Sequence, residues 1–352
     1  MIKAAVPVLI GVALAVLVQL AAGPIIGPFA AKLLMDIGIN VILAVSLNLV
    51  NGFTGQFSIG HAGFMAVGGY TAGCITYYGS FLLFGNTQVQ PGWLSHGDLL
   101  FLGGCLAGAV VAAIAGIIVG LPSLRLRGDY LAIVTLGFGE ILRVMLQRTG
   151  DVLGTADEVH KASVGTLATS LGGSLGFSGI PYYTDLFWIY TFVTITLVVA
   201  LRLKFSSYGR AFLSVRENEI AAEAVGINTT RLKVRAFVLA AAFAGIAGGL
   251  FAHEVGTSLN PRELGFQKSF DIVIMVVLGG MGSVSGAVLA AIVLTLLPEA
   301  LRSFSEFRMP IYALALILMM ILRPQGILGL RELWELSWFP KRKTKPTEKA
   351  AA

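Results

Sequence analysis

Long apolar stretches recur along the whole chain, and short segments rich in glycine, proline and charged residues separate them. A run of about 20 apolar residues is long enough to cross the hydrocarbon core of a bilayer as a helix. A helix also satisfies its own backbone hydrogen bonds, which lipid cannot do. The pattern predicts crossings over residues 5–22, 32–50, 57–78, 99–121, 130–146, 186–201, 234–253, 270–278, 284–297 and 310–322. We therefore expect an all-α fold, a polytopic transmembrane helical bundle of about ten spans in which some helices are short and broken by glycine.

Composition and charge narrow the class of protein. Only 12% of the 352 residues are charged, against about 25% in soluble domains. The net charge of +6 does not indicate a nucleic-acid partner, because most basic residues lie beside spans, as in an oriented membrane protein. The positive-inside rule places both termini and residues 204–233 in the cytoplasm. Residues 4–22 also fit a cleaved signal sequence, but the apolar run exceeds the usual length and favours a retained helix.

The segment 204–233 is unusually polar, with eight charged residues. Helical periodicity predicts one helix over residues 210–225. Its apolar face carries Phe212, Val215, Ala222 and Val225, and its charged face carries Arg216, Glu219 and Glu223. Gly226 is expected to end this helix at a positive φ, and Asn228, Thr229 or Thr230 to begin the next one. Such a helix suits docking against another protein at the membrane surface, and a solvated connecting loop is the alternative.

Two stretches, 40–60 and 270–286, repeat a pattern of apolar helix, glycine-rich turn with a serine, and second helix. Duplicated glycine-broken segments often mark the solute pathway of a transporter. The candidate pathway residues in these turns are Gly52, Gly55, Gln56, Ser58, Gly60, His61, Gly279, Gly280 and Gly282. Close helix packing is the other role of such glycines, and the small-residue motifs 69–73 and 282–286 fit it.

Ionisable residues inside a predicted span give a further candidate. Glu140 and Arg143 lie one turn apart in the span 130–146, where they are placed to pair. An intramembrane pair of this kind usually faces a cavity or another helix. Glu140 is therefore a candidate pathway residue, and a hydrated structural pair near the end of the span is the alternative.

No pattern in the sequence indicates an enzyme. A Walker A loop and a Gly-x-Ser-x-Gly nucleophile motif are both missing from it. The four histidines have no partners at metal-ligand spacing. Cys74 and Cys105 both lie in apolar stretches, which favours neither a disulfide framework nor a zinc site. We expect no cofactor, no metal site and no covalent catalysis.

Four ordered motifs together resemble one family. They are NLVNGFTGQFSIGHAGF at 48–64, LRGDYLAIVTLGFGE at 126–140, LGGMGS at 278–283 and RPQGILG at 323–329. Over about residues 35–330 the chain resembles the membrane permeases of branched-chain amino acid ABC importers, of the LivM type. Similar permeases serve urea, amides and other amino acids, so the resemblance is more specific for the family than for the solute.

The resemblance implies a multi-pass transport subunit of the bacterial inner membrane. The implied partners are a homologous second permease of the LivH type, two ABC ATPase subunits, a periplasmic solute-binding protein and the membrane lipid. Residues 1–330 would form the transmembrane permease domain and residues 331–352 a cytoplasmic basic tail. The rival class is a self-sufficient secondary transporter that uses Glu140 as a proton site.

The resemblance also implies a role for the helix in segment 204–233. Permeases of ABC importers carry a cytoplasmic helix of Glu-Ala-Ala-x-x-x-Gly pattern that docks into a groove of the ATPase. Ala221, Ala222 and Gly226 match this pattern, whereas Ile220 stands where it has glutamate. The residues expected to form the ATPase-coupling surface are Arg216, Glu217, Glu219, Ala221, Ala222, Glu223 and Gly226.

Overall fold

The computed structural model describes residues 7, 9, 11–13, 15–19, 27–90, 95–123, 129–254, 258–304, 308–323 and 325–335. Much of the predicted span 5–22 and all of residues 336–352 lie outside the described residues. The described part of the chain is built from helices and contains no β-strand. The all-α prediction is therefore confirmed.

The elements fall into long helices, short helices and single turns. The long helices are α2 (Pro28–Asn48), α3 (His61–Phe84), α4 (His96–Ser123), α5 (Asp129–Gln147), α8 (Leu186–Phe205), α11 (Thr229–Glu254), α12 (Phe266–Gly279), α13 (Val284–Ala300) and α14 (Arg308–Leu322). The short helices are α6 (Ala156–Lys161), α7 (Val164–Thr169), α9 (Ser207–Glu217) and α10 (Glu219–Ala224). A π-helical turn spans Leu49–Phe53, and 3₁₀ turns span Gly173–Leu175, Leu301–Phe304 and Leu333–Glu335.

Five helices in the described part of the chain are long and apolar enough to cross a membrane. They cover Pro28–Phe53, His96–Pro122, Tyr130–Gln147, Leu186–Phe205 and Thr229–Glu254. Each coincides with a predicted span. The helix α12 has 14 residues and α13 has 17, so at about 1.5 Å per residue neither reaches the usual spanning length. The count of ten crossings stays a prediction.

The core of the bundle is formed by α3, α4 and α11, which pack against one another. Glycines let these backbones approach closely. A Cβ added to Gly68 would lie 2.2 Å from the Gly245 carbonyl oxygen, and one added to Gly248 would lie 1.9 Å from the Met65 carbonyl oxygen. A Cβ on Gly69 would lie 2.9 Å from the carbonyl oxygen of Gly248, which is the packing contact predicted for this motif.

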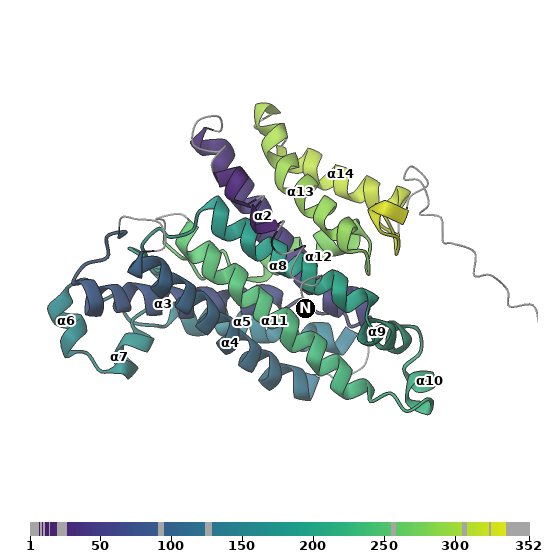
Figure 1. The fold of residues 1–352 in the computed structure, drawn as a ribbon, viewed down its shortest axis with the longest axis horizontal. Helices are drawn as coiled ribbons and strands as arrows, with labels where there is room; N and C mark the ends of the chain where they lie inside the picture. The colour runs from purple at the N-terminus through teal and green to yellow at the C-terminus, as the bar shows by residue number, and fades with distance from the viewer. Residues whose placement is uncertain are drawn as a thin grey trace, which may run out of the picture.

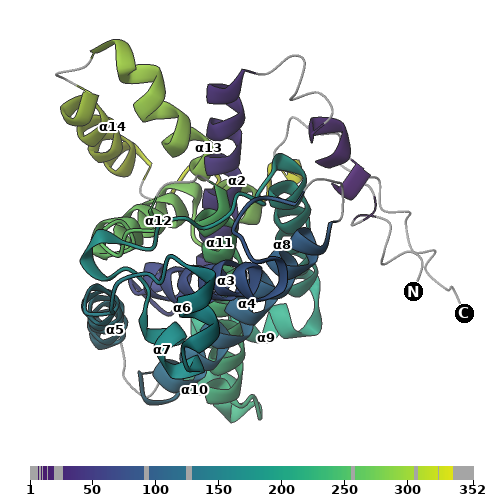
Figure 2. The same cartoon turned by 90° about the vertical axis from the view of Figure 1, so that its left-hand side faces the viewer.

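The arrangement separates the two ends of the molecule. The helices α6 and α7 lie at one end of the long axis and α9 and α10 at the other (Figure 1). The helices α2, α13 and α14 stand together on one side of the remaining helices (Figure 2). The predicted topology puts α6 and α7 on the outer side of the membrane and α9 and α10 on the cytoplasmic side. These two pairs of helices therefore lie at opposite ends of the structure.

We expect Gly248→Ala to destabilise the protein, because its methyl group would overlap the Met65 carbonyl. Overpacking of this kind costs about 1–3 kcal/mol. The control is Gly103→Ala on α4, where an added Cβ has nothing within 4 Å. Thermal unfolding of the detergent-solubilised protein should show a lower midpoint for Gly248→Ala and an unchanged or higher one for Gly103→Ala. Equal midpoints for the two variants would contradict the packing described for α3 and α11.

Candidate functional site

The two glycine-rich turns that repeat along the chain are in direct contact. The first follows α2 and the second joins α12 to α13. The Asn48 side chain binds backbone groups of the second turn: its Oδ1 accepts a hydrogen bond from the Gly282 N–H at 2.8 Å, and its Nδ2 donates one to the Ser283 carbonyl at 2.9 Å. A Cβ on Gly52 would lie 2.4 Å from the Gly282 nitrogen. The turns meet so closely that Gly52 leaves no room for a side chain.

The segment after α14 closes over the second turn. The Ile327 N–H donates to the Leu278 carbonyl at 2.8 Å, and the Leu328 N–H donates to the Gly279 carbonyl at 3.3 Å. These carbonyls end α12 and have no partner within the helix. Gly280 has a φ of 107°, which a residue with a side chain rarely adopts. Both N–H donors belong to the RPQGILG motif, so this motif completes the turn.

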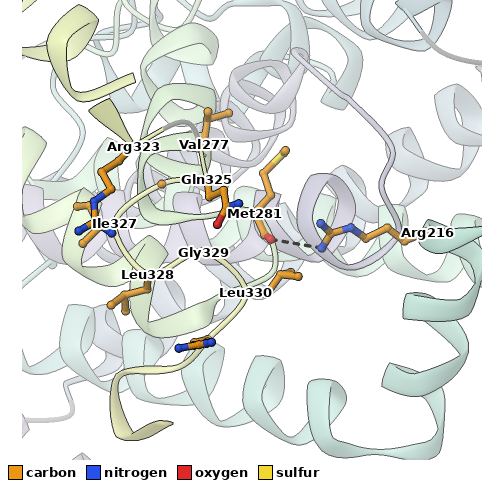
Figure 3. A pocket seen from close by; sticks show the side chains of 11 residues that line it. Arg216, Val277, Met281, Arg323, Gln325, Ile327, Leu328, Gly329 and Leu330 are labelled. Atoms are coloured by element: carbon orange, nitrogen blue, oxygen red, sulfur yellow. Dashed lines mark hydrogen bonds between the residues drawn. The ribbon is translucent and has the colours of Figure 1, made fainter. Parts of the chain in front are cut away.

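Two basic side chains attach the turns to neighbouring helices. The Arg216 guanidinium on α9 donates to the Gly52 carbonyl at 2.8 Å and to the Met281 carbonyl at 3.3 Å (Figure 3). The Lys204 ammonium on α8 donates to the Gly282 carbonyl at 2.8 Å. Arg216, expected on the coupling surface, thus reaches inward and joins α9 to both turns.

The two glycine-rich turns meet Arg216 and Lys204 at one place, which we call the junction. A buried acid completes this junction. Glu332 has no exposed surface (0%) and forms an ion pair with Lys204. Its carboxylate accepts hydrogen bonds from the N–H groups of Val284 at 3.0 Å and Ser285 at 2.9 Å, at the start of α13, where a helix favours negative charge. Burial by itself would raise the pKa of Glu332, but the hydrogen bonds from Lys204, Ser285 and Val284 outweigh it and hold that pKa below its ordinary value.

Sequence reasoning missed Glu332. Nothing in the local pattern distinguishes it from Glu335, because only the fold brings it to the start of α13. The segment that follows residue 330 is therefore anchored to the bundle at Glu332. The boundary between a permease domain and a tail at residue 330 stays a prediction.

A cavity of about 860 Å³ opens beside the junction (Figure 3). Its lining combines the three basic residues Arg216, Arg323 and Arg331 with apolar and backbone groups. The other lining residues are Val277, Met281, Gln325, Gly326, Ile327, Leu328, Gly329 and Leu330. No acidic side chain is among these described residues, so the cavity favours an anionic or polar group.

The single helix predicted in the charged segment is two helices, α9 and α10. Asn218 separates them with an extended backbone (φ −158°, ψ 108°), and its side chain accepts a hydrogen bond from the Ala221 N–H at 3.0 Å. Asparagine favours such a cap over a helix interior, so the prediction of one continuous helix was wrong. Gly226 has a φ of 85° and ends the pair as predicted. Asn228 then caps α11 by accepting from the Arg231 N–H at 2.9 Å.

The predicted burial of the apolar face of this helix pair is confirmed in part. Phe212, Val215 and Ala222 are buried. Val225 was expected beside them but is 76% exposed, because it follows the last residue of the short helix α10 and has no neighbour to cover it. Ile220 is 72% exposed. The helix α10 and the residues just after it, which we call the tip, therefore expose apolar side chains.

Two glutamates predicted on the coupling surface have partners within the chain. Glu219 forms an ion pair with Lys233 at 2.5 Å. Glu223 accepts a hydrogen bond from the Thr229 hydroxyl at 2.7 Å. Both contacts join α10 to the start of α11, so these acids fix the position of the tip.

The first turn contains non-helical backbone that the protein encloses. The chain from Thr54 to Gly60 has no helical structure, yet most of it is buried. The backbone N–H of Ser58 donates to Asn51 Oδ1 at 3.1 Å, and the Ile59 N–H donates to Thr135 Oγ1 at 3.1 Å. Such backbone is tolerated at membrane depth only where protein or a polar cavity surrounds it.

The polar side chains predicted for the pathway lie along this enclosed segment. Gln56 is buried, and its Oε1 atom has no hydrogen-bond partner in the described part of the chain. The His61 Nε2 atom lies 2.8 Å from the Ser46 hydroxyl. A Cβ on Gly60 would lie 2.1 Å from the Thr135 carbonyl oxygen, and one on Gly55 would lie 3.0 Å from Arg216 Cγ. The first turn thus packs against both α5 and α9.

The predicted pair of Glu140 and Arg143 is present, at 2.7 Å. The other Glu140 oxygen accepts a hydrogen bond from the Phe266 N–H at 3.0 Å and caps the start of α12. The opposite end of α12, at Gly279, lies about 20 Å away for a helix of this length. The structure therefore brings Gly52, Gly55 and Gly282 to Arg216 and leaves Glu140 apart from them.

Comparison with known proteins places the chain in a family. Residues 29–323 match the model of the permease component of branched-chain amino acid transport systems. The high-affinity branched-chain amino acid transport system permease protein LivM of Salmonella typhimurium is 39% identical over 307 residues, covering 82% of this chain and 68% of the relative. LivM of Escherichia coli K12 is 38% identical over the same shares of the two chains. LivH of Escherichia coli K12 is 27% identical over 292 residues, covering 82% of this chain and 90% of the relative.

No solved structure matches the chain. The family match includes both glycine turns, the helix pair α9 and α10, and the whole of α14. It covers most of the chain, and the two LivM proteins share more than a third of the aligned residues with it. This chain belongs to the family of permease components of branched-chain amino acid transport systems.

Proposed function

We propose that this chain is the membrane permease subunit of an ATP-driven importer that moves branched-chain amino acids into the cytoplasm. Family membership and the transport systems named for the LivM and LivH relatives support this function. The sequence contains no nucleotide-binding loop, so two ABC ATPase subunits supply the energy. The greater similarity to LivM than to LivH favours a LivH-type partner in the membrane. A periplasmic binding protein delivers the solute.

The observation that carries the proposal is the double attachment of Arg216. The helices α9 and α10 lie at one end of the molecule (Figure 1), and Arg216 connects α9 to the carbonyls of Gly52 and Met281. Asn48 holds the two turns to each other. A partner that displaces α9 therefore displaces both turns together, which is the rigid-body movement that alternating access requires.

The proposed orientation puts α9 and α10 in the cytoplasm and α6 and α7 on the outer side, in keeping with the distribution of basic residues. Both termini are then cytoplasmic. Residues 1–330 form the permease domain, and residues 331–352 form the cytoplasmic tail. The enclosed first turn, with Gln56 and His61, lies along the proposed pathway, whereas capping of α12 accounts for Glu140.

The proposed ATPase contact is the tip of α10. Apolar side chains exposed in water at an end of a membrane protein are typical of a protein interface. Charged residues at the edge of such a contact orient the partner. The exposed residues proposed for the contact are Glu217, Ile220, Ala221, Val225 and Gly226.

Reconstitution into proteoliposomes tests the proposed function directly. We expect uptake of labelled leucine only when the LivH-type permease, the two ATPase subunits, the binding protein and ATP are all present. Uptake by this chain alone, driven by a proton gradient without nucleotide, would refute the proposal and establish the secondary transporter instead.

We expect Arg216→Gln to separate ATP hydrolysis from transport. The variant loses the charge-assisted hydrogen bonds to both turns, and the loss of about 1.4 kcal/mol of coupling reduces uptake by roughly tenfold. ATP hydrolysis by the assembled complex should stay near the unsubstituted rate. The control is Arg210→Gln on the same helix, since the Arg210 guanidinium contacts the exposed Ser207 hydroxyl at 3.1 Å. Equal uptake by the two variants would show that Arg216 does not transmit the movement.

Substitution of the exposed tip should prevent assembly. Ile220→Arg combined with Val225→Arg introduces two charges into the proposed apolar contact without disturbing a buried side chain. Copurification of the ATPase subunits should fall by at least about tenfold, with normal membrane insertion. Val164→Arg is the control, because Val164 is 83% exposed at the opposite end of the molecule. Undiminished copurification with the double variant would exclude α10 as the docking element.

A further inference from the structure

A group of charged side chains lies at the end of the bundle away from α9 and α10. Lys32, Asp36 and Asn40 follow one another at intervals of four residues along one face of α2. Glu254 is the last residue of α11, and Lys268 lies in the first turn of α12. The helix α2 packs against both α11 and α12. Since α11 begins just after α10 and its 26 residues extend about 38 Å, this group is remote from the coupling helices.

The carboxylate of Glu254 is buried and unpaired. The residue is 7% exposed, and neither carboxylate oxygen has a hydrogen-bond partner in the described part of the chain. Asp36, Lys32 and Lys268 act on its charge, yet none of the ion pairs within 4.0 Å among the described residues joins any two of these four groups. A buried carboxyl group whose oxygens both lack partners is unfavourable, and inside a membrane protein such a group usually serves a function.

Lys268 is held in place by a neutral partner. Its ammonium donates to Asn40 Oδ1 at 3.0 Å, and Asn40 Nδ2 donates in turn to Thr295 Oγ1 at 3.0 Å. An ammonium has three donors, so this contact leaves two for another acceptor. Four acids act on the Lys268 charge from a distance: Asp271, Asp36, Glu254 and Glu263. None of these acids forms an ion pair with Lys268 within 4.0 Å among the described residues.

Both charges also stand at unfavourable helix ends. The C-terminus of a helix carries partial negative charge and favours cations, and the N-terminus favours anions. Glu254 places an acidic group at the C-terminus of α11, and Lys268 places a basic group at the N-terminus of α12. Exchange of the two residues would suit both helix dipoles, so stability does not explain this arrangement.

We infer that Glu254 and Lys268 form a binding site for the zwitterionic headgroup of an amino acid. The α-ammonium binds the free oxygens of Glu254, with Asp36 nearby, and the α-carboxylate binds the free donors of Lys268, which Asn40 positions. The inference rests on the proposed function and assigns the place where the solute binds at the outer side of the spans. An amine or a carboxylic acid would leave one of the two charges unpaired, so the site selects zwitterions.

Thermal unfolding of the solubilised permease pair tests binding without transport. L-leucine should raise the midpoint, as a ligand of the native state does. Equal concentrations of 3-methylbutylamine or 4-methylpentanoate, which lack one of the two charges, should leave it unchanged. Glu254→Gln and Lys268→Met should each abolish the leucine shift. The control Asp185→Asn, which changes an exposed carboxylate before α8, should retain it.

The midpoint without ligand separates a binding role from a structural one. Glu254→Gln replaces a buried carboxyl group that has no partner in the unliganded protein, so its unliganded midpoint should equal or exceed that of the unsubstituted protein. A lower midpoint would show that the Glu254 charge stabilises the fold and would overturn the inference. A leucine shift that persists in both variants, or an equal shift with the amine or the acid, would overturn it as well.

Uptake by the complete complex separates this inference from the proposed function. Glu254→Gln and Lys268→Met should each slow ATP-driven leucine uptake at least tenfold, with ATP hydrolysis and subunit composition unchanged. Normal uptake by both variants would refute the site and leave the importer in place. A leucine shift without uptake by the unsubstituted complex would refute the importer and leave the site in place.

Discussion

Backbone groups that are freed inside a membrane must find partners within the protein, and this constraint organises the molecule. The chain leaves helical structure at the first glycine turn and again between α12 and α13. Lipid cannot supply hydrogen bonds to such groups, so other parts of the chain have to supply them. Asn48, Arg216 and the segment after α14 do so. The contacts draw elements from both halves of the sequence to one junction.

The junction also explains where the charged residues near α9 lie. Arg216 and Lys204 bind carbonyls of the turns, and Glu332 balances Lys204 while it binds the start of α13. A buried charge is tolerated when it is paired and its remaining atoms are hydrogen-bonded. Glu332 meets both conditions and stays ionised. Charged groups thereby link α8, α9 and α13 to one another and to the backbone of the two turns. Movement of the coupling helix α9 would disturb this backbone.

The junction and the group around Glu254 and Lys268 share two helices. The helix α2 carries Asp36 and Asn40 in its first half and Asn48 at its end, while α12 begins near Lys268 and ends at the second turn. A shift of either helix along its axis therefore changes both polar centres. This shared framework gives a physical route by which solute bound at one end and movement of α9 at the other could bias the same arrangement of helices.

The sequence by itself determined the membrane as solvent, the all-α class, the long helices, the two glycine turns and the family, because apolar length and local glycine spacing are properties of short stretches. It also located Gly226 as a helix end. The tertiary structure decided which polar groups meet. Arg216 and Gly52 are 164 residues apart, and Glu332 meets Val284 across 48, so no local pattern could pair them. The helix breaks at Asn218 because the Asn218 side chain caps α10, and Val225 is exposed because no neighbouring residue covers it. The periodicity of apolar residues predicts neither feature.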